Sequence, residues 1–162
     1  MASELHVDAI KHSGGTSAMT IDSSGRVTTS TNRPAFMARR TSNQSNGIVI
    51  FDTVMLNQGS HYDNSNGRFT APLAGLYNFS FNVLSDNDGT DGYWTTSLFI
   101  NGSDYCKVQN YTYSDNDYGG SLSVIASLSA SDYVQVNNAA INVYGTSSAT
   151  QNFTWFCGYL IG

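Results

Sequence analysis

The chain has 162 residues, the usual size of one domain, and 40% of them are apolar, enough to build a hydrophobic core. Only 12% of the residues are charged and the formal net charge is −5. This composition argues against a nucleic-acid-binding surface, because such surfaces depend on Lys and Arg. The sequence holds no apolar run of about 18 residues, so we expect no membrane insertion.

Residues 1–33 are polar, small and poor in aromatic side chains. Met19 and Ile21 alternate with polar residues, and the stretch 22–25 (Asp-Ser-Ser-Gly) predicts a turn between two short extended pieces. This segment cannot bury enough apolar area to fold alone. We therefore expect a short extended stalk or anchor arm that is ordered mainly by partners.

From residue 34 onward, apolar and polar residues alternate with a period of two. The stretch 77–83 is the clearest case, since Tyr, Phe, Phe and Val alternate there with Asn, Ser and Asn. Turn dipeptides such as Asn46-Gly47 and Asn101-Gly102 separate short runs of this kind. Many short strands at regular spacing predict an all-β sandwich or barrel over residues 34–162.

The last of these strands is apolar on both faces. Phe156 and Leu160 share one face, and the other face carries a longer apolar series: Phe153, Trp155, Cys157, Tyr159 and Ile161. A strand that is apolar on both faces is expected to be covered on both. The outer cover is either a second copy of the chain or a loop of the same chain.

The sequence offers little chemistry for catalysis. Glu4 is the only glutamate, so paired carboxylates for acid–base catalysis would have to be aspartates. The three histidines are not spaced as metal ligands, and no nucleotide-binding or nucleophile motif is present. Cys106 and Cys157 are predicted to be reduced, largely buried thiols. We expect a binding protein and not an enzyme.

The run GRFTAPLAGLYNFSF at 67–81 resembles the signature of the complement C1q globular head, which belongs to the tumour-necrosis-factor-like jelly rolls. Residues 34–36 resemble the opening strand of that head and 156–160 its closing strand, so the resemblance covers about residues 34–162. It implies a ten-stranded jelly-roll sandwich, here called the knob, that assembles into a homotrimer.

The same resemblance implies that a set of aromatic residues divides between the core and the threefold contact: Tyr77, Phe79, Phe81, Trp155 and Tyr159. The chain departs from the family in one respect, because it has no collagen-like Gly-X-Y stalk. Complement activity is therefore not implied.

Residues 5–12 and 15–27 carry a second resemblance, to tail-fibre and virion proteins of marine tailed phages. Those proteins place a short β stalk before a knob. The resemblance implies that the chain lies on the surface of a virion and that residues 1–33 contact other virion proteins.

Two acidic loops are candidate sites. Asp86, Asp88 and Asp91 are spaced as oxygen ligands of calcium often are, although no closing Glu follows them. The alternative is a set of Asp, Asn and Gly turns chosen for backbone geometry and solubility. Calcium is the one cofactor that the sequence suggests.

Aromatic side chains accompany these loops. Rings beside carboxylates and amides are typical of a neutral-sugar site, because they combine stacking with directional hydrogen bonds. The candidate ligand-binding residues are Tyr93, Trp94, Tyr111, Tyr113, Asp115, Asp117 and Tyr118. The alternative, favoured for Trp94, is that these rings cap the core or the trimer contact.

The resulting interpretation is a trimeric fibre or spike knob of a phage virion that binds a host-surface receptor, either a glycan or a protein. Two alternatives stay open at this point. The chain could be a capsid head decoration protein anchored by its N-terminal arm, or a soluble lectin-like binding module.

Overall fold

The computed structural model describes residues 7–29, 33–86, 89, 91–113 and 117–162, and within them every regular element is a β-strand. The chain divides into two units, Met1–Arg33 and Pro34–Gly162. No helix in the described part of the chain is long and apolar enough to cross a membrane.

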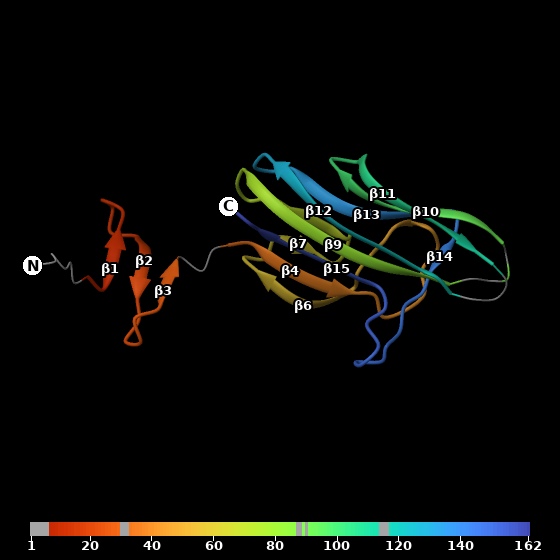
Figure 1. The fold of residues 1–162 in the computed structure, drawn as a ribbon, viewed down its shortest axis with the longest axis horizontal. Coiled ribbons are helices and arrows are strands. Elements are labelled where there is room, and N and C mark those ends of the chain that lie inside the picture. Colours follow the sequence, from red (N-terminus) through yellow and green to blue (C-terminus); the bar gives the residue numbers. More distant parts are fainter. Residues whose placement is uncertain (1–6, 30–32, 87–88, 90, 114–116) are drawn as a thin grey trace, which may run out of the picture. The chain divides into compact units, whose positions relative to one another are not determined.

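The first unit is a three-stranded antiparallel sheet (Figure 1) formed by β1 (Ala9–Lys11), β2 (Ser17–Ile21) and β3 (Val27–Thr29). The turn predicted at 22–25 is present, because the Asp22 carboxylate accepts the backbone N–H groups of Ser24 and Arg26 at 2.9 and 3.0 Å. The expected extended arm is wrong for residues 9–29. A second turn, in which the Gly15 N–H donates to the His12 carbonyl at 2.8 Å, folds β1 back onto β2.

The second unit consists of two six-stranded sheets. The first has the order β11-β10-β13-β8-β7, with β5 also paired to β13: β5 (Gly47–Ile48), β7 (Tyr62–Asp63), β8 (Arg68–Thr70), β10 (Gly92–Ile100), β11 (Ser103–Thr112) and β13 (Tyr133–Ala139). The second has the order β12-β9-β15-β4-β6, with β14 also paired to β9: β4 (Ala35–Arg39), β6 (Thr53–Gln58), β9 (Gly75–Asp86), β12 (Gly119–Leu128), β14 (Asn142–Val143) and β15 (Trp155–Leu160). The described part of this unit thus has twelve strands where ten were expected, and three of them are only two residues long.

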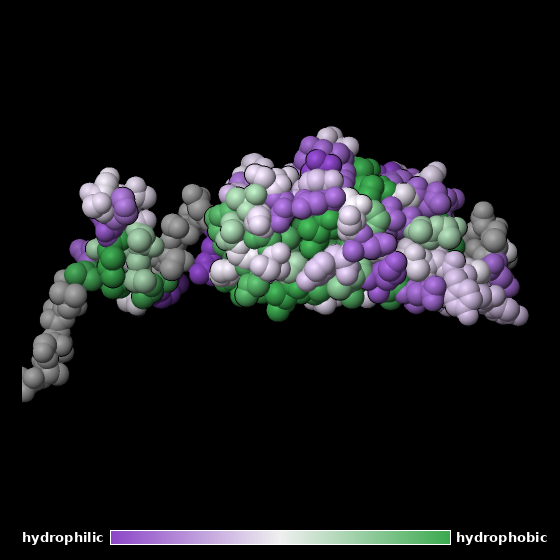
Figure 2. Space-filling model, turned by 90° about the horizontal axis from the view of Figure 1, so that it is seen from above, coloured by the Kyte–Doolittle hydropathy of each residue, from purple (hydrophilic) through white to green (hydrophobic). Residues whose placement is uncertain are grey.

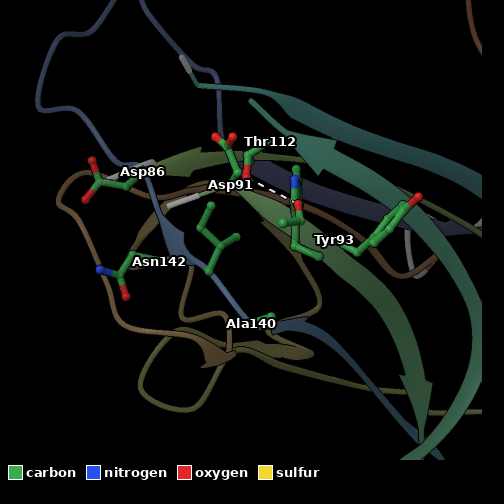
Figure 3. A pocket seen from close by; sticks show the side chains of 9 residues that line it. Asp86, Asp91, Tyr93, Thr112, Ala140 and Asn142 are labelled. Atoms are coloured by element: carbon green, nitrogen blue, oxygen red, sulfur yellow. Dashed lines mark hydrogen bonds between the residues drawn. The ribbon is translucent and has the colours of Figure 1, made fainter. Parts of the chain in front are cut away.

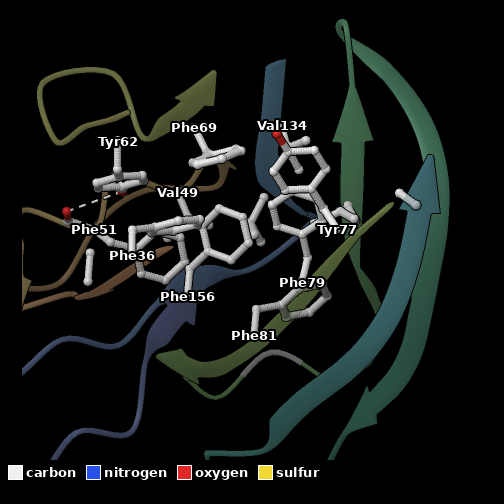
Figure 4. Packing of buried hydrophobic residues seen from close by; sticks show 14 of the residues in the cluster. Phe36, Val49, Phe51, Tyr62, Phe69, Tyr77, Phe79, Phe81, Val134 and Phe156 are labelled. Carbon is white, nitrogen blue, oxygen red and sulfur yellow. Dashed lines mark hydrogen bonds between the residues drawn. The ribbon is translucent and has the colours of Figure 1, made fainter. Parts of the chain in front are cut away.

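The inner faces of the two sheets enclose one aromatic core (Figure 4). The alternation predicted at 77–83 is confirmed, because Tyr77, Phe79 and Phe81 on β9 are at most 1% exposed. Across the core, Phe36 stacks on Tyr62 with ring centroids 4.7 Å apart. Each aromatic pair of this kind adds about 0.5–1.5 kcal/mol beyond the burial of its area.

The turn between β7 and β8 requires a glycine. Gly67 has a φ of +69°, in the left-handed region that side chains with a Cβ rarely adopt. A Cβ at this position would lie 2.5 Å from the carbonyl oxygen of Val49. The glycine that opens the signature run therefore serves both the turn and the close approach of a neighbouring segment.

The outer face of the second sheet is open and largely apolar over β15, β4 and β6, whereas β9 presents Asn78, Ser80 and Asn82 there. On β15, Phe156 is fully buried in the core, whereas Tyr159 on the opposite face is 51% exposed. Pairing places Cys157 beside Met37, and Met37 beside Leu56, which is 50% exposed. We call this surface the outer sheet face, with members Met37, Leu56, Ile125, Trp155, Cys157 and Tyr159. Figure 2 shows apolar side chains gathered on the surface of this unit.

Leu56 and Tyr159 are about half-exposed, so no loop in the described part of the chain covers them, and a second copy of the chain as the cover stays a prediction. The two cysteines are free and half-buried, and they lie in different sheets, on β11 and β15. Burial raises the pKa of the Cys157 thiol.

Candidate functional site

One end of the sandwich holds a cavity of about 310 Å³ (Figure 3). Antiparallel pairing builds it, because Gly92 at the start of β10 pairs with Thr112 at the end of β11, and Asn142 on β14 pairs with Asp86 at the end of β9. Its walls come from four segments distant in sequence: Asp86, Asp91, Gly92, Tyr93, Trp94, Thr112, Ala140, Ile141 and Asn142.

A buried asparagine fixes one wall of the cavity. Asn138 is fully buried, its Oδ1 accepts the hydroxyl of Thr96 at 2.8 Å, and its Nδ2 donates to the carbonyl of Ile141 at 2.7 Å. Ala140, which lies in the chain between Asn138 and Ile141, has a φ of +80°. A left-handed conformation costs a non-glycine residue about 1–2 kcal/mol. The cavity wall is thus held in a strained shape by a buried hydrogen-bond network.

The cavity is acidic. The carboxylates of Asp86 and Asp91 line it, and no Lys or Arg is among the described lining residues. Asp86 Oδ2 accepts the side-chain amide of Asn43 at 2.7 Å, which holds that carboxylate at the rim. Figure 3 shows Asp91 next to Thr112, whose hydroxyl donates to the Gly92 carbonyl at 3.3 Å.

Two of the three predicted calcium ligands therefore share this cavity, and Asp88 lies outside the described residues. Within the described ranges, no group of three His, Cys, Asp or Glu side chains is placed to hold a metal ion. The described residues offer two carboxylates and the Asn142 side chain as oxygen donors, the type of ligand that calcium prefers. Calcium binding stays a prediction.

Two tyrosines on β10 and β11 make an exposed aromatic pair, and one of them, Tyr93, also lines the cavity. Tyr93 is 69% exposed and Tyr111 46% exposed, and their rings meet edge to face with centroids 4.9 Å apart. Tyr113 is also exposed. The pair thus presents ring surface to solvent, but only Tyr93 lines the cavity, and its ring extends away from Asp86 and Asp91 (Figure 3).

Trp94 differs from its neighbour, because it is only 2% exposed. Of the two interpretations of this residue, packing inside the sandwich fits its burial, although part of the ring borders the cavity. The indole Nε1 finds no acceptor among the described residues. Trp94 therefore leaves a hydrogen-bond donor unused next to the candidate site.

The described residues of the second acidic loop, Asp117 and Tyr118, do not line the cavity. Tyr118 is half-buried and tied to β9, since its N–H donates to the Ser85 hydroxyl at 2.8 Å. Its hydroxyl donates to the Tyr113 carbonyl at 3.4 Å. Asp117 is exposed, and Asp115 lies outside the described residues. Of the seven predicted ligand-binding residues, Tyr93 and Trp94 line the cavity.

Sequence analysis missed the wall formed by Ala140, Ile141 and Asn142, as well as Thr112. These residues carry no charged or aromatic group that would mark a site. They become part of it only through strand pairings between segments far apart in the chain.

The sequence pattern of the C1q domain matches residues 35–161. The chain belongs to the C1q domain family. The resemblance inferred from the signature run is thus confirmed, and the cavity lies inside the C1q domain.

Two proteins that carry the same name in two species illustrate this membership. Human complement C1q tumor necrosis factor-related protein 3 is 30% identical over 129 residues, which cover 78% of this chain and 49% of the relative. The mouse protein of that name matches with the same identity and the same coverage. The chain thus spans about half the length of these relatives.

Solved structures share the fold. The globular domain of zebrafish complement 1qA protein superimposes with a TM-score of 0.63 at 19% identity, covering 80% of this chain and 98% of that domain. Murine APRIL superimposes with a TM-score of 0.64 at 13% identity, covering 80% of this chain and 99% of that protein. The C1q domain described here is therefore a jelly roll of the C1q and tumour-necrosis-factor type.

Proposed function

We propose that the chain is a trimeric attachment protein whose C1q domain binds a glycan on a cell surface through the cavity. The observation that carries this proposal is the exposed Tyr93–Tyr111 pair, of which Tyr93 belongs to a cavity lined by two carboxylates and an amide. Sugar rings stack on exposed aromatic faces, while their hydroxyls donate to carboxylate and amide oxygens. C1q domains are typically trimeric binding modules, which is consistent with this role.

The outer sheet face supports the trimeric part of the proposal. Leu56, Ile125 and Tyr159 are each half-exposed or more on a surface that also includes Met37 and Trp155. Contiguous apolar surface of this kind marks protein interaction sites in soluble proteins. Packing these faces together removes them from water and displays several cavities at once, which raises weak single-site affinity through effective concentration.

The setting that we propose is the surface of a phage virion, as a fibre or spike knob. The support is the resemblance of residues 5–12 and 15–27 to marine phage fibre proteins. In this arrangement residues 1–33 connect the knob to other virion proteins. Immunogold labelling of virions with an antibody to the knob tests the setting: gold at fibre tips supports it, and unlabelled particles contradict it.

Light scattering tests self-association. The purified chain is expected to have about three times its 17.5 kDa mass. Tyr159→Asp places a charge on the outer sheet face and should reduce the mass to that of one chain. Gln109→Asp is the matched control, because this exposed residue lies on β11 of the other sheet and its variant should keep the trimer. A wild-type monomer would contradict the proposal.

A glycan array probed with the intact protein tests binding. Retention of a defined glycan by the wild type, and its loss with Tyr93→Ser, supports the cavity as the site. Retention that is unchanged in this variant would contradict it.

A further inference from the structure

One face of the small N-terminal sheet gathers four aliphatic side chains, with Ser17 and Thr29 at register positions on the same side. Register pairs Ile10 with Met19 and Ile21 with Val27. Met19 and Ile21 are alternate residues of β2, and alternate residues of a strand point to the same side. All four side chains therefore lie on one face, which we call the stalk face.

The stalk face is open to solvent. Ile10 is 52% exposed, Ile21 37% and Val27 57%. The opposite face carries small residues such as Ala9 and Ala18. A single three-stranded layer cannot cover its own apolar side, and sheets of this size need such a face to be packed for stability. Something outside the sheet must therefore cover it.

Size indicates what the cover is. An interface between separate proteins buries about 800 Å² on each side, which is more than a patch of four side chains offers. A tethered partner needs much less, because linkage gives effective concentrations of about millimolar. Five residues join the end of β3 to the start of β4, and they span at most about 18 Å. In a trimer, the three short tethers keep the three N-terminal sheets close to one another, so that each sheet has two other copies within reach.

We propose that the stalk faces of the copies pack against one another and form a short trimeric stalk ahead of the C1q domains. This inference rests on the self-association proposed above. It assigns residues 9–29 a role in the assembly itself and makes the sheet stable only in the oligomer. Attachment to other proteins then uses the opposite side of the sheet, which carries Ala9 and Ala18.

Neighbouring residues on opposite faces of β2 provide a matched test in the full-length chain. Met19 lies at the middle of the central strand, on the stalk face, and Ala18 points the other way. Met19→Cys and Ala18→Cys are treated with a short bis-maleimide, and the links are identified by peptide mass spectrometry. We expect a link between two copies of residue 19 and none between two copies of residue 18.

Light scattering of each sample distinguishes a failure of the proposed self-association from a failure of the stalk alone. A monomer contradicts the proposed self-association and the stalk with it. A trimer in which residue 19 forms no link to its copy contradicts the stalk alone and leaves the proposed self-association standing. Hydrogen exchange gives a second measure: Ile10→Ser with Val27→Ser should abolish the protection of residues 9–29 and leave that of β9 unchanged. Equal protection of residues 9–29 from hydrogen exchange in the wild type and in this double variant would also overturn the inference.

Discussion

Tyr93 and Tyr111 stand opposite each other on β10 and β11, with ring planes at 76° and centroids 4.9 Å apart. Both rings are largely exposed, so they add little to the core. If the exposed pair binds a ligand, its removal should weaken binding without lowering the stability of the fold.

The Tyr93→Ala variant is therefore expected to bind the array-selected glycan about two- to tenfold more weakly, with an unchanged melting temperature, since one aromatic contact contributes about 0.5–1.5 kcal/mol. Titration calorimetry and thermal unfolding measure the two quantities. Tyr105→Ala is the control, because Tyr105 is also an exposed tyrosine of β11 but does not line the cavity. Equal loss of affinity in both variants would contradict the assignment.

Gly158 on β15 is expected to tolerate no side chain. A Cβ there would lie 2.5 Å from Cδ1 of Phe79 and 2.9 Å from Cε1 of Phe36. Gly158→Ala should destabilise the fold by about 1–3 kcal/mol, the cost of overpacking a core. Gly92→Ala should have little effect, because no heavy atom lies within 4 Å of its Cβ position. Denaturant unfolding compares the pair, and similar midpoints would refute the prediction.

Ala140→Gly is expected to stabilise the protein by about 1 kcal/mol, because glycine adopts the φ of +80° without strain. At the neighbouring position, Ala139→Gly places glycine at the last residue of β13, where Ala139 pairs with Thr95, and should destabilise the protein by about 0.5–1 kcal/mol. The melting temperature should rise above that of the wild type in Ala140→Gly and fall below it in Ala139→Gly. A loss of stability in both variants would show that the strain at Ala140 is not relieved by glycine.

Asp132 gives the protein a pH dependence. Its carboxylate accepts the Asn101 amide at 2.8 Å and the Ser129 N–H at 2.7 Å, and these hydrogen bonds lower its pKa below the usual 3.8. A lowered native pKa stabilises the fold above pH 3.8, and this contribution is lost as the pH falls through the native pKa. Asp132→Asn should therefore show a smaller drop in melting temperature between about pH 6 and about pH 3 than the wild type. Identical pH profiles would contradict the assignment.

Calcium binding at the cavity predicts that a chelator lowers the melting temperature, because a ligand that binds only the folded state stabilises it. Asp91→Asn should remove this response. Asp104→Asn should retain it, since Asp104 pairs with Lys107 on β11 and does not line the cavity. A wild-type protein whose unfolding is indifferent to the chelator would exclude a stabilising calcium site.

The sequence predicted the elements whose signal is local. The alternation over 77–83 identified β9 and its buried face, because the period of a strand is visible in one short segment. Trp94 shows the limit of this signal. Tyr93 and Trp94 are adjacent, so they face opposite sides of β10, and only the pairing with other strands decides which of them is buried. The cavity wall at 140–142 depends on such pairings entirely.

The half-buried thiol of Cys157 lies within the surface that we assign to self-association. Its raised pKa keeps it protonated near neutral pH, and a thiol is far less reactive than a thiolate toward oxidants and disulfides. The raised pKa therefore disfavours a disulfide between copies at this contact of the proposed trimer. Packing is then the interaction that joins the copies there, and such an assembly is expected to dissociate reversibly on dilution.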